Sequence, residues 1–255
     1  MTGTKNKIAL VTGSSRGLGK DMALQLARKE FDVVITYHSK RDEAAQVVDE
    51  IESMGRKAHA LQLDVAASNS FNAFVKNLKA VLKSEFDTEA IDAVVNNAGT
   101  GVHASFTDTT PEQFDNMMNI HVKAPYFLTQ KLLDVLKDGG SIVNISSGLA
   151  RFSFPGYSAY GTMKGAVETL TKYQAKELGA RHIRVNVVAP GAIETDFGGG
   201  AVRDNHELNK MISSLTALGR VGLPDDIGGV VAFLCSDDSK WVNAQRIEVA
   251  GGIFA

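Results

Sequence analysis

Seven short strand-like runs recur along the chain, and longer segments with apolar residues at helical spacing separate them. Near-continuous apolar strands that alternate with helices are typical of a parallel sheet covered by helices on both faces. The pattern predicts an α/β fold with a doubly wound, Rossmann-type parallel sheet of about seven strands, in a three-layer α/β/α sandwich. The expected strands are Ile8–Val11, Val33–Thr36, Ala60–Leu63, Ala93–Asn96, Ser141–Ile145, Arg184–Val188 and Arg246–Val249.

The segment from Thr110 to Gln113 has the composition of a helix start. The Thr110 hydroxyl can accept a backbone N–H, the Gln113 side chain can reach back, and Pro111 suits the first helical position. We expect one helix to run from here through Leu136, and another to run from Tyr160 to Leu178.

No internal repeat, low-complexity tract or Pro/Ser-rich linker divides the 255 residues. Because α/β folds of this size are routinely single domains, we expect one domain over residues 1–255. Three glycines, Gly198 to Gly200, predict a mobile flap, and with Phe197 and Met211 they suggest a lid over a partly apolar pocket at about residues 191–216. An ordinary surface insertion would have the same composition.

Charge and composition exclude several classes of partner. With 27 basic and 29 acidic residues the net charge is -2, so nothing draws the chain to nucleic acid or to an anionic membrane. We find no leader and no apolar run near the roughly 18 residues of a spanning helix, and expect a cytoplasmic protein with a small-molecule partner. The one cysteine, Cys235, is expected to be buried, and the six scattered histidines predict no metal site.

A glycine-rich loop follows the first expected strand, with Gly13, Gly17 and Gly19 leading directly into a helical segment. Glycines let the backbone approach a pyrophosphate closely, and the N–H groups of the next helix favour that anion. The spacing Gly-x-x-x-Gly-x-Gly differs from the six-residue dinucleotide fingerprint, and an ordinary glycine-rich turn is the alternative. The position after strand one of a βα repeat favours a dinucleotide.

The end of the second expected strand indicates which nicotinamide cofactor binds. An acidic residue there commonly binds the ribose 2′-hydroxyl, but Tyr37 to Arg41 contains no acid and offers His38, Lys40 and Arg41 instead. With Arg16 these cations suit a 2′-phosphate, so we expect NADP(H), although exposed basic pairs often only solvate a loop. Asp64 could accept a bond from the adenine amino group or cap the helix that begins near Ser68.

Tyr160 and Lys164 lie four residues apart on an expected helix, so the phenol and the ammonium can share one face. A neighbouring cation stabilises a phenolate and lowers the tyrosine pKa toward neutral pH. Ser147 follows an expected strand, at the edge of the sheet where ligands bind. Asn119 lies mid-helix, where it could bond water or backbone inward or simply face solvent. His103 and His121 could border the site, but a lone histidine is more often structural.

These motifs resemble the classical short-chain dehydrogenases/reductases, most closely the 3-oxoacyl-acyl-carrier-protein reductase-like branch. They occur in family order over essentially the whole chain: Thr12 to Gly19, Asn96 to Gly99, Ser147, Tyr160 to Lys164, and Pro190-Gly191. The segment Trp241 to Gln245 departs from the family pattern, because a more usual glycine-bearing turn is replaced there.

The resemblance implies a role for each motif. Tyr160 would be the general acid in reduction or the base in oxidation, and Ser147 would polarise the substrate carbonyl. Lys164 would bind the nicotinamide ribose and lower the tyrosine pKa, while Asn119 would hold a water in a proton relay to it. The residues expected to bind the cofactor are Gly13, Ser15, Arg16, Gly17, Leu18, Gly19, Tyr37, His38, Ser39, Asp64, Val65, Asn97, Ala98, Gly99, Tyr160, Lys164, Pro190, Gly191, Ile193 and Thr195.

The leading expectation is NADPH-dependent reduction of a ketone or aldehyde, of the carbonyl or 3-oxoacyl reductase type. The motifs do not fix direction, so NADP-linked oxidation of a sugar or secondary alcohol stays open. A noncatalytic NADP(H)-binding sensor would be expected to have lost Tyr160 or Lys164. Family members commonly form homotetramers, so we expect a homotetramer or homodimer. Arg181 or Arg203 could meet an acidic acyl-carrier protein, and the substrate itself is not readable.

Overall fold

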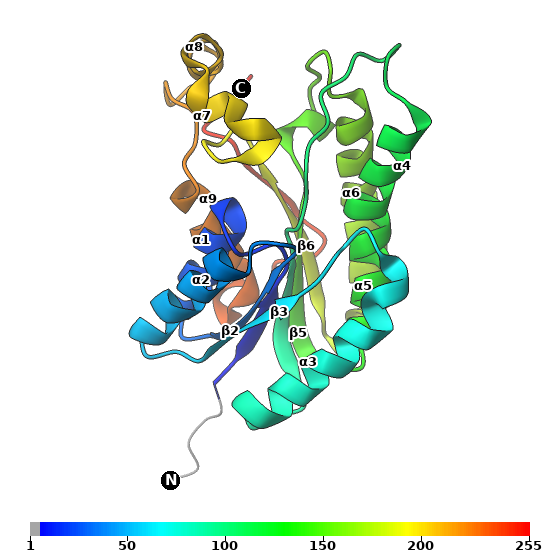
Figure 1. The fold of residues 1–255 in the computed structure, drawn as a ribbon, viewed down its shortest axis with the longest axis vertical. Helices are drawn as coiled ribbons and strands as arrows, with labels where there is room; N and C mark the ends of the chain where they lie inside the picture. Colours follow the sequence, from blue (N-terminus) through cyan, green and yellow to red (C-terminus); the bar gives the residue numbers. More distant parts are fainter. Residues whose placement is uncertain (1–5) are drawn as a thin grey trace.

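The structure, a computed structural model, describes residues 6–255, so residues 1–5 of the expected domain lie outside the described residues. Its seven strands form one sheet in the order β3-β2-β1-β4-β5-β6-β7, and every neighbouring pair is parallel. The predicted doubly wound α/β fold is confirmed (Figure 1). The strands are β1 Ile8–Val11, β2 Asp32–Tyr37, β3 Ala58–Gln62, β4 Ile91–Asn96, β5 Leu136–Ile145, β6 Arg184–Pro190 and β7 Arg246–Val249.

Helices cover both faces of the sheet. α1 (Gly17–Arg28), α2 (Arg41–Ser53) and α9 (Asp225–Cys235) pack on one face, and α3 (Phe71–Glu85), α5 (Ala124–Leu132) and α6 (Ser158–Glu177) pack on the other (Figure 1). In β2, Val33 and Ile35 join the first core and Val34 joins the second, because successive strand side chains point to opposite faces. Burial on both sides explains why β1 is apolar throughout and β2 nearly so.

The predicted helix start at Thr110 is present as a full capping box. Thr110 Oγ1 accepts the Gln113 N–H at 3.3 Å, and Gln113 Oε1 accepts the Thr110 N–H at 3.0 Å. Pro111 is the first residue of α4 (Pro111–Met118). These reciprocal bonds satisfy N–H groups that a helix start otherwise leaves without partners.

The prediction that this helix continues through Leu136 is wrong. After α4 the chain makes a π-helical turn, Asn119–Lys123, then α5 ends at Leu132, and Leu136 pairs with Ile91 in the sheet. Pro125 lacks a backbone N–H, so the α-helical bond back to residue 121 cannot form, which accounts for the wider turn there. The apolar spacing of the segment near Leu136 fits a helix and a strand equally well.

The three glycines of the predicted mobile flap lie in a 3₁₀ turn. Gly198, Gly199 and Gly200 have φ angles of 62°, 75° and 79°, a left-handed region that favours glycine. This turn, Phe197–Gly200, leads into α7 (Ala201–Asp204) and α8 (His206–Ser214). That residues 191–216 act as a mobile lid stays a prediction.

Further short 3₁₀ helices lie at Ser68–Ser70, Gly148–Ala150, Gly179–Arg181 and Asp237–Ser239. Cys235 is buried in α9 as predicted, and burial raises the pKa of its thiol to about 12. Among residues 6–255, no helix is both long and apolar enough to cross a membrane.

Candidate active site

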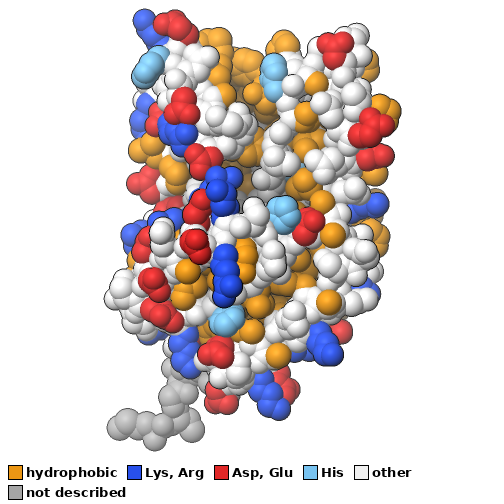
Figure 2. Space-filling model, viewed as in Figure 1, with side chains coloured by type: hydrophobic (Ala, Val, Ile, Leu, Met, Phe, Trp, Pro, Cys, Tyr) orange, Lys and Arg blue, Asp and Glu red, His pale blue; other side chains and the backbone are white. Residues whose placement is uncertain are grey.

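The candidate active site lies along the carboxyl ends of β1, β4, β5 and β6. The strand order reverses between β1 and β4, and ligands of open α/β sheets bind in the crevice beside such a reversal. Figure 2 shows hydrophobic side chains in the hollow that separates the part carrying α7 and α8 from the part carrying α4 and α6. Apolar groups therefore lie next to the strand ends.

Gly13 and Gly19 leave no room for side chains on the inner surface of the loop, and Gly17 has a left-handed φ of 56°. A Cβ on Gly13, whose φ is 63°, would lie 2.7 Å from Ala98 Cα. A Cβ on Gly19 would overlap the carbonyl oxygen of Gly13, and one on Gly17 would approach Thr195 Cβ at 3.7 Å. The loop therefore exposes bare backbone between the ends of β1, β4 and β6, which fits a pyrophosphate.

The first turn of α1 faces this loop. Arg16 precedes the helix in extended conformation, and α1 has no acidic side chain in its first turn. The N–H groups of Gly17, Leu18 and Gly19 are thus presented without a competing carboxylate, and Ser15 lies partly buried beside them. Such a helix end favours an anion through its free donors and its dipole.

Asn97 links the end of β4 to the glycine loop through hydrogen bonds. Its side-chain nitrogen donates to the carbonyl oxygens of Thr12 and Gly13 at 2.9 Å and 3.1 Å. The Thr12 hydroxyl in turn accepts the N–H groups of Asn97 and Ala98, both at 3.0 Å. These bonds fix the backbone at the ends of β1 and β4, and the expected contact of Asn97 with the cofactor stays a prediction.

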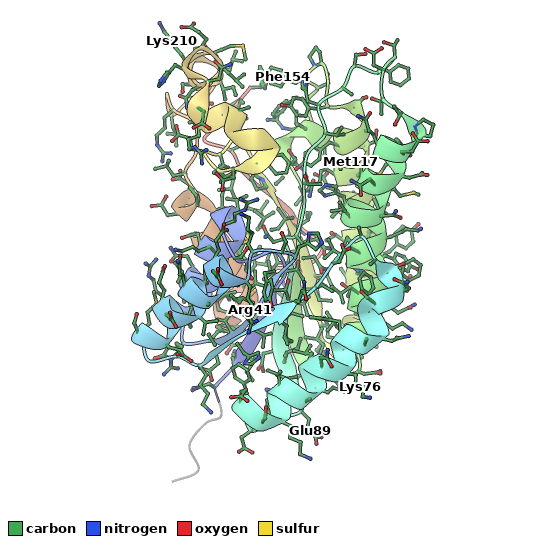
Figure 3. All side chains as sticks on the ribbon, viewed as in Figure 1. Arg41, Lys76, Glu89, Met117, Phe154 and Lys210 are labelled. Carbon is green, nitrogen blue, oxygen red and sulfur yellow. The ribbon has the colours of Figure 1, made fainter. Side chains whose placement is uncertain are left out.

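The end of β2 carries no carboxylate of its own. Tyr37 is partly buried, His38 and Ser39 are exposed, and Arg41 opens α2 on the surface (Figure 3). Asp64, from the loop after β3, lies 3.9 Å from His38 Nε2. The groups near a ribose phosphate here are therefore hydroxyls, a histidine next to Asp64, Arg41, and Lys40, which lies 3.6 Å from Glu43.

The two roles left open for Asp64 can now be weighed. Its Oδ1 accepts the backbone N–H of Ala66 at 2.9 Å, which closes a local turn two residues ahead of the Ser68–Ser70 helix. Asp64 is therefore not the N-cap residue of that helix. Val65, in the same loop, lines a small cavity together with His121 and Lys164.

A carboxylate from the predicted lid contacts the glycine loop. Asp196 Oδ2 lies 3.2 Å from Arg16 Nη1, and its other oxygen accepts a hydrogen bond from Arg203 of α7. The bond from Arg203 holds the pKa of Asp196 below its usual value, so the carboxylate is charged at neutral pH. Sequence reasoning missed Asp196, because nothing in the spacing indicates a contact over 180 residues.

Ser147, Tyr160 and Lys164 come together between β5 and α6. Ser147 follows the end of β5 in extended conformation, and its hydroxyl accepts the Leu149 N–H at 3.2 Å and lies close enough to Tyr160 to act on that residue's pKa. Lys164 Nζ donates to the carbonyl oxygen of Ile145 at 2.7 Å and lies 5.4 Å from the centre of the Tyr160 ring. Tyr160 and Lys164 are both buried, with 8% and 5% of their surface exposed.

Burial dominates the ionisation of both α6 side chains. It raises the pKa of Tyr160 above its usual value, and the hydrogen bond from Ser147 opposes this only in part. Burial also lowers the pKa of Lys164 to about 7. In the protein alone the tyrosine pKa is thus raised and not lowered as expected, because burial of the phenol dominates its ionisation.

Asn119 begins the π-helical turn rather than lying inside an α-helix, and the turn packs against α6. Two residues later, His121 meets the Tyr160 ring edge-on, with ring centres 5.2 Å apart. A Cβ on Gly99 would lie 2.8 Å from His121 Cε1, so the glycine gives this ring its space. Single π turns often mark functional sites, and the local sequence signal for this one is Pro125.

The loop after β6 closes the site from the other side. The Gly191 N–H donates to the Val249 carbonyl at 3.0 Å, which fixes the chain just past Pro190. Ile193 pairs with Gly222 in an isolated bridge. The chain then passes Gly17 at Thr195, so predicted cofactor residues from the first and sixth strands lie side by side.

Aromatic side chains approach Tyr160 from the lid segment. The Phe197 ring lies 5.5 Å from the Tyr160 ring, and Gly101 packs against Phe197. Phe152, Phe154 and Phe254 form a further cluster, with Phe154 near the upper end of the molecule in Figure 3. Flat apolar surfaces therefore border the hydroxyl groups of the site.

Comparisons with known proteins agree with this arrangement. A family model described as enoyl-(acyl carrier protein) reductase matches residues 13–253. A hydroxynaphthalene reductase-like protein from Metarhizium brunneum is 37% identical, over 96% of this chain and 94% of its own length.

Solved structures give the same result. The angucycline C-6 ketoreductase LanV with bound NADP has a TM-score of 0.92 at 37% identity, over 97% of this chain and 95% of LanV. A second LanV structure holds NADP and rabelomycin. A short-chain dehydrogenase from Burkholderia cenocepacia in complex with NADP has a TM-score of 0.89 at 34% identity, over 98% of each chain. The chain belongs to the short-chain dehydrogenase/reductase family of oxidoreductases.

Proposed function

We propose that the protein reduces a ketone or aldehyde to an alcohol with NADPH, and that Tyr160 is the general acid. The observation that carries this proposal is the convergence of Ser147, Tyr160 and Lys164 beside the glycine loop. The ketoreductases among its relatives support carbonyl reduction as the general reaction.

The cofactor is NADP(H). The bare backbone at Gly13 and Gly19 fits the pyrophosphate, and we assign the 2′-phosphate to Arg16 before α1 and Arg41 at the start of α2. No acidic residue occupies the end of β2 to repel that phosphate. NADP in the LanV and Burkholderia structures supports the same choice.

The chain's own residues hold the carbonyl and supply its proton. The Ser147 hydroxyl donates to the carbonyl oxygen and so stabilises the negative charge that develops there. Bound NADPH supplies the hydride that reduces the carbonyl carbon. Tyr160 then gives its phenolic proton to the same oxygen. Lys164 holds the nicotinamide ribose hydroxyls, and Asn119 holds a water of the proton relay.

The ionisation of Tyr160 favours the reductive direction. Burial raises the tyrosine pKa, so the phenol is protonated at neutral pH, as an acid must be. A developing alkoxide is far more basic than a phenolate and still takes the proton. Oxidation would instead require a phenolate base, which burial disfavours.

The preferred substrate is a ketone attached to a bulky ring system rather than an acyl-carrier thioester. The Phe197 ring contacts the Tyr160 ring, with centres 5.5 Å apart, and adds a flat apolar surface beside the acid against which a ring can pack. The naphthalene ring in the name of the Metarhizium relatives supports this class. Residues 191–216 serve as the lid, with Phe197 as the side chain nearest the chemistry.

We further propose that the protein acts in the cytoplasm as one domain per chain and assembles as a homotetramer or homodimer. Phe114, Tyr126 and Phe127 on α4 and α5, and Trp241 with 97% of its surface exposed, provide apolar area that an assembly would cover.

A kinetic screen tests this function. Purified protein with NADPH is offered 2-tetralone, a bicyclic ketone, alongside acetoacetyl thioesters and small aliphatic ketones, and oxidation of NADPH is followed. We expect the bicyclic ketone to have the highest kcat/KM. Higher efficiency with the thioesters would contradict the substrate class, and comparable efficiency with NADH would contradict the cofactor assignment.

A further inference from the structure

Phe254 has a backbone conformation that a bulky residue rarely adopts. Its φ of 52° lies in the left-handed region, where the Cβ of any residue other than glycine crowds the backbone. The side chain keeps 42% of its surface exposed, so burial compensates for this strain only in part. Strained residues that persist in a fold cluster at active sites and ligand-binding sites. Phe254 is therefore a candidate for a functional role.

Residues 250–255, which follow β7, connect two parts of the chain that border the hollow. On one side they pair with the end of the predicted lid, where the Phe254 N–H donates to the Leu215 carbonyl at 3.2 Å. On the other side Arg151, in the loop after β5, donates to the Ile253 carbonyl at 2.9 Å. Figure 1 shows the end of the chain near α7 and α8. Phe254 is thus fixed between the lid and the loop that carries the catalytic serine.

Phe152 connects Phe254 with the catalytic serine. A Cβ on Gly148, the residue after Ser147, would lie 2.8 Å from Phe152 Cε1, so the Phe152 ring packs against the serine loop. The Phe254 ring lies 4.8 Å from the Phe152 ring and 5.9 Å from that of Phe154. Phe154 lies at the upper end of the molecule in Figure 3, where Figure 2 shows the apolar hollow. Aromatic surface therefore extends from Ser147 outward to Phe254.

We propose that Phe254 is a specificity-determining residue, whose exposed ring binds the part of a fused-ring ketone that lies farther from the carbonyl. The inference rests on the proposed function, because the attached rings reach Phe254 only when Ser147 holds the carbonyl oxygen. A fused ring system is rigid, so its second ring packs against Phe152 and Phe254 with little further loss of rotational freedom. A small aliphatic ketone does not extend to Phe254 and gains nothing from it.

Two variants separate this role from one in which Phe254 only holds the lid. Phe254→Gly removes the ring and also relieves the strain, because glycine adopts positive φ readily. Phe254→Tyr keeps an aromatic ring in the same place. Leu218→Ala is the matched control, because the Leu218 N–H donates to Gly251 in the same backbone pairing and its side chain is 72% exposed.

We expect the KM of Phe254→Gly for 2-tetralone to rise about five- to tenfold, the effect of losing one aromatic contact. Its kcat, its Kd for NADPH and its KM for butanone should stay near the wild-type values. Its melting temperature should change little, because relief of the strain offsets the lost packing. Phe254→Tyr and Leu218→Ala should both keep the wild-type KM for 2-tetralone.

An unchanged KM for 2-tetralone in Phe254→Gly, or an equal rise for 2-tetralone and butanone, would overturn the proposal. Binding without turnover gives a second measurement, because protein saturated with NADP⁺ has no hydride to transfer. Calorimetric titration of that complex with 2-tetralone should give a Kd about five- to tenfold higher for Phe254→Gly than for the wild type. Equal Kd values, or no binding by the wild type, would also overturn it. If the wild type binds 2-tetralone but reduces no carbonyl compound with NADPH, the proposed function fails, and the calorimetric comparison still decides the role of Phe254.

Discussion

The buried ammonium of Lys164 should destabilise the folded protein, and its removal should stabilise it. The lysine pKa falls from 10.5 to about 7 on folding, which corresponds to about 5 kcal/mol of unfavourable free energy for the charged form. Relaxation of the fold around the charge reduces this penalty. Lys164→Met also leaves the Ile145 carbonyl without its 2.7 Å donor, at a cost of roughly 1–2 kcal/mol. The expected net gain in the free energy of unfolding is about 2–3 kcal/mol at pH 6.

The pH dependence of this gain identifies its origin. The penalty is fully present below pH 7, where folded and unfolded chains both carry the proton. It fades as the pH rises from about 7 through 10.5, because the folded state loses the proton first. Thermal unfolding of the cofactor-free protein should show a rise in Tm of roughly 5–10 °C at pH 6, and little of it at pH 10.

Lys172→Met is the matched control, because Lys172 lies on the same helix and is exposed. It should leave Tm nearly unchanged at both pH values. Destabilisation by Lys164→Met at pH 6, or an equal gain at pH 6 and pH 10, would refute the reasoning from burial.

Two further predictions concern the cofactor. Gly19→Ala should weaken NADPH binding at least about tenfold in a fluorescence titration, because its Cβ overlaps the loop backbone, whereas Gly165→Ala, which meets open space, should not. Equal Kd values for the two variants would contradict the fit of the loop. Asp196→Asn should lower the Kd for NADPH by about two- to fivefold and change that for NADH little, since it removes a negative charge beside Arg16. Asp204→Asn, which pairs with Arg203 instead, is the control, and an equal effect on NADH would count against Arg16 as the 2′-phosphate ligand.

Much of the fold follows from local pattern. Strands buried on both faces are apolar throughout, so Val33 to Thr36 and Ser141 to Ile145 could be recognised without knowing their neighbours. The capping box at Thr110 could also be predicted, because both of its bonds join residues three apart. The length of the next helix could not, because the apolar residues near Leu136 fit either structure and sheet pairing with Ile91 decides between them.

The site shows the same division. The positions of Ser147, Tyr160 and Lys164 could be predicted from strand ends and helical spacing. The ionisation of Tyr160 and Lys164 depends on burial, which residue spacing does not indicate. The contact of Asp196 with Arg16 and the position of His121 at Tyr160 arise from tertiary packing. Neither has a local sequence signal.

The most direct test of the central claim is ketone reduction by Tyr160→Phe with saturating NADPH. Phenylalanine keeps the buried ring and removes only the hydroxyl. The account predicts that kcat falls by at least about a hundredfold, the effect of losing a general acid, while the Kd for NADPH changes little. Turnover near the wild-type rate would show that another group protonates the carbonyl oxygen and would contradict the assignment of Tyr160.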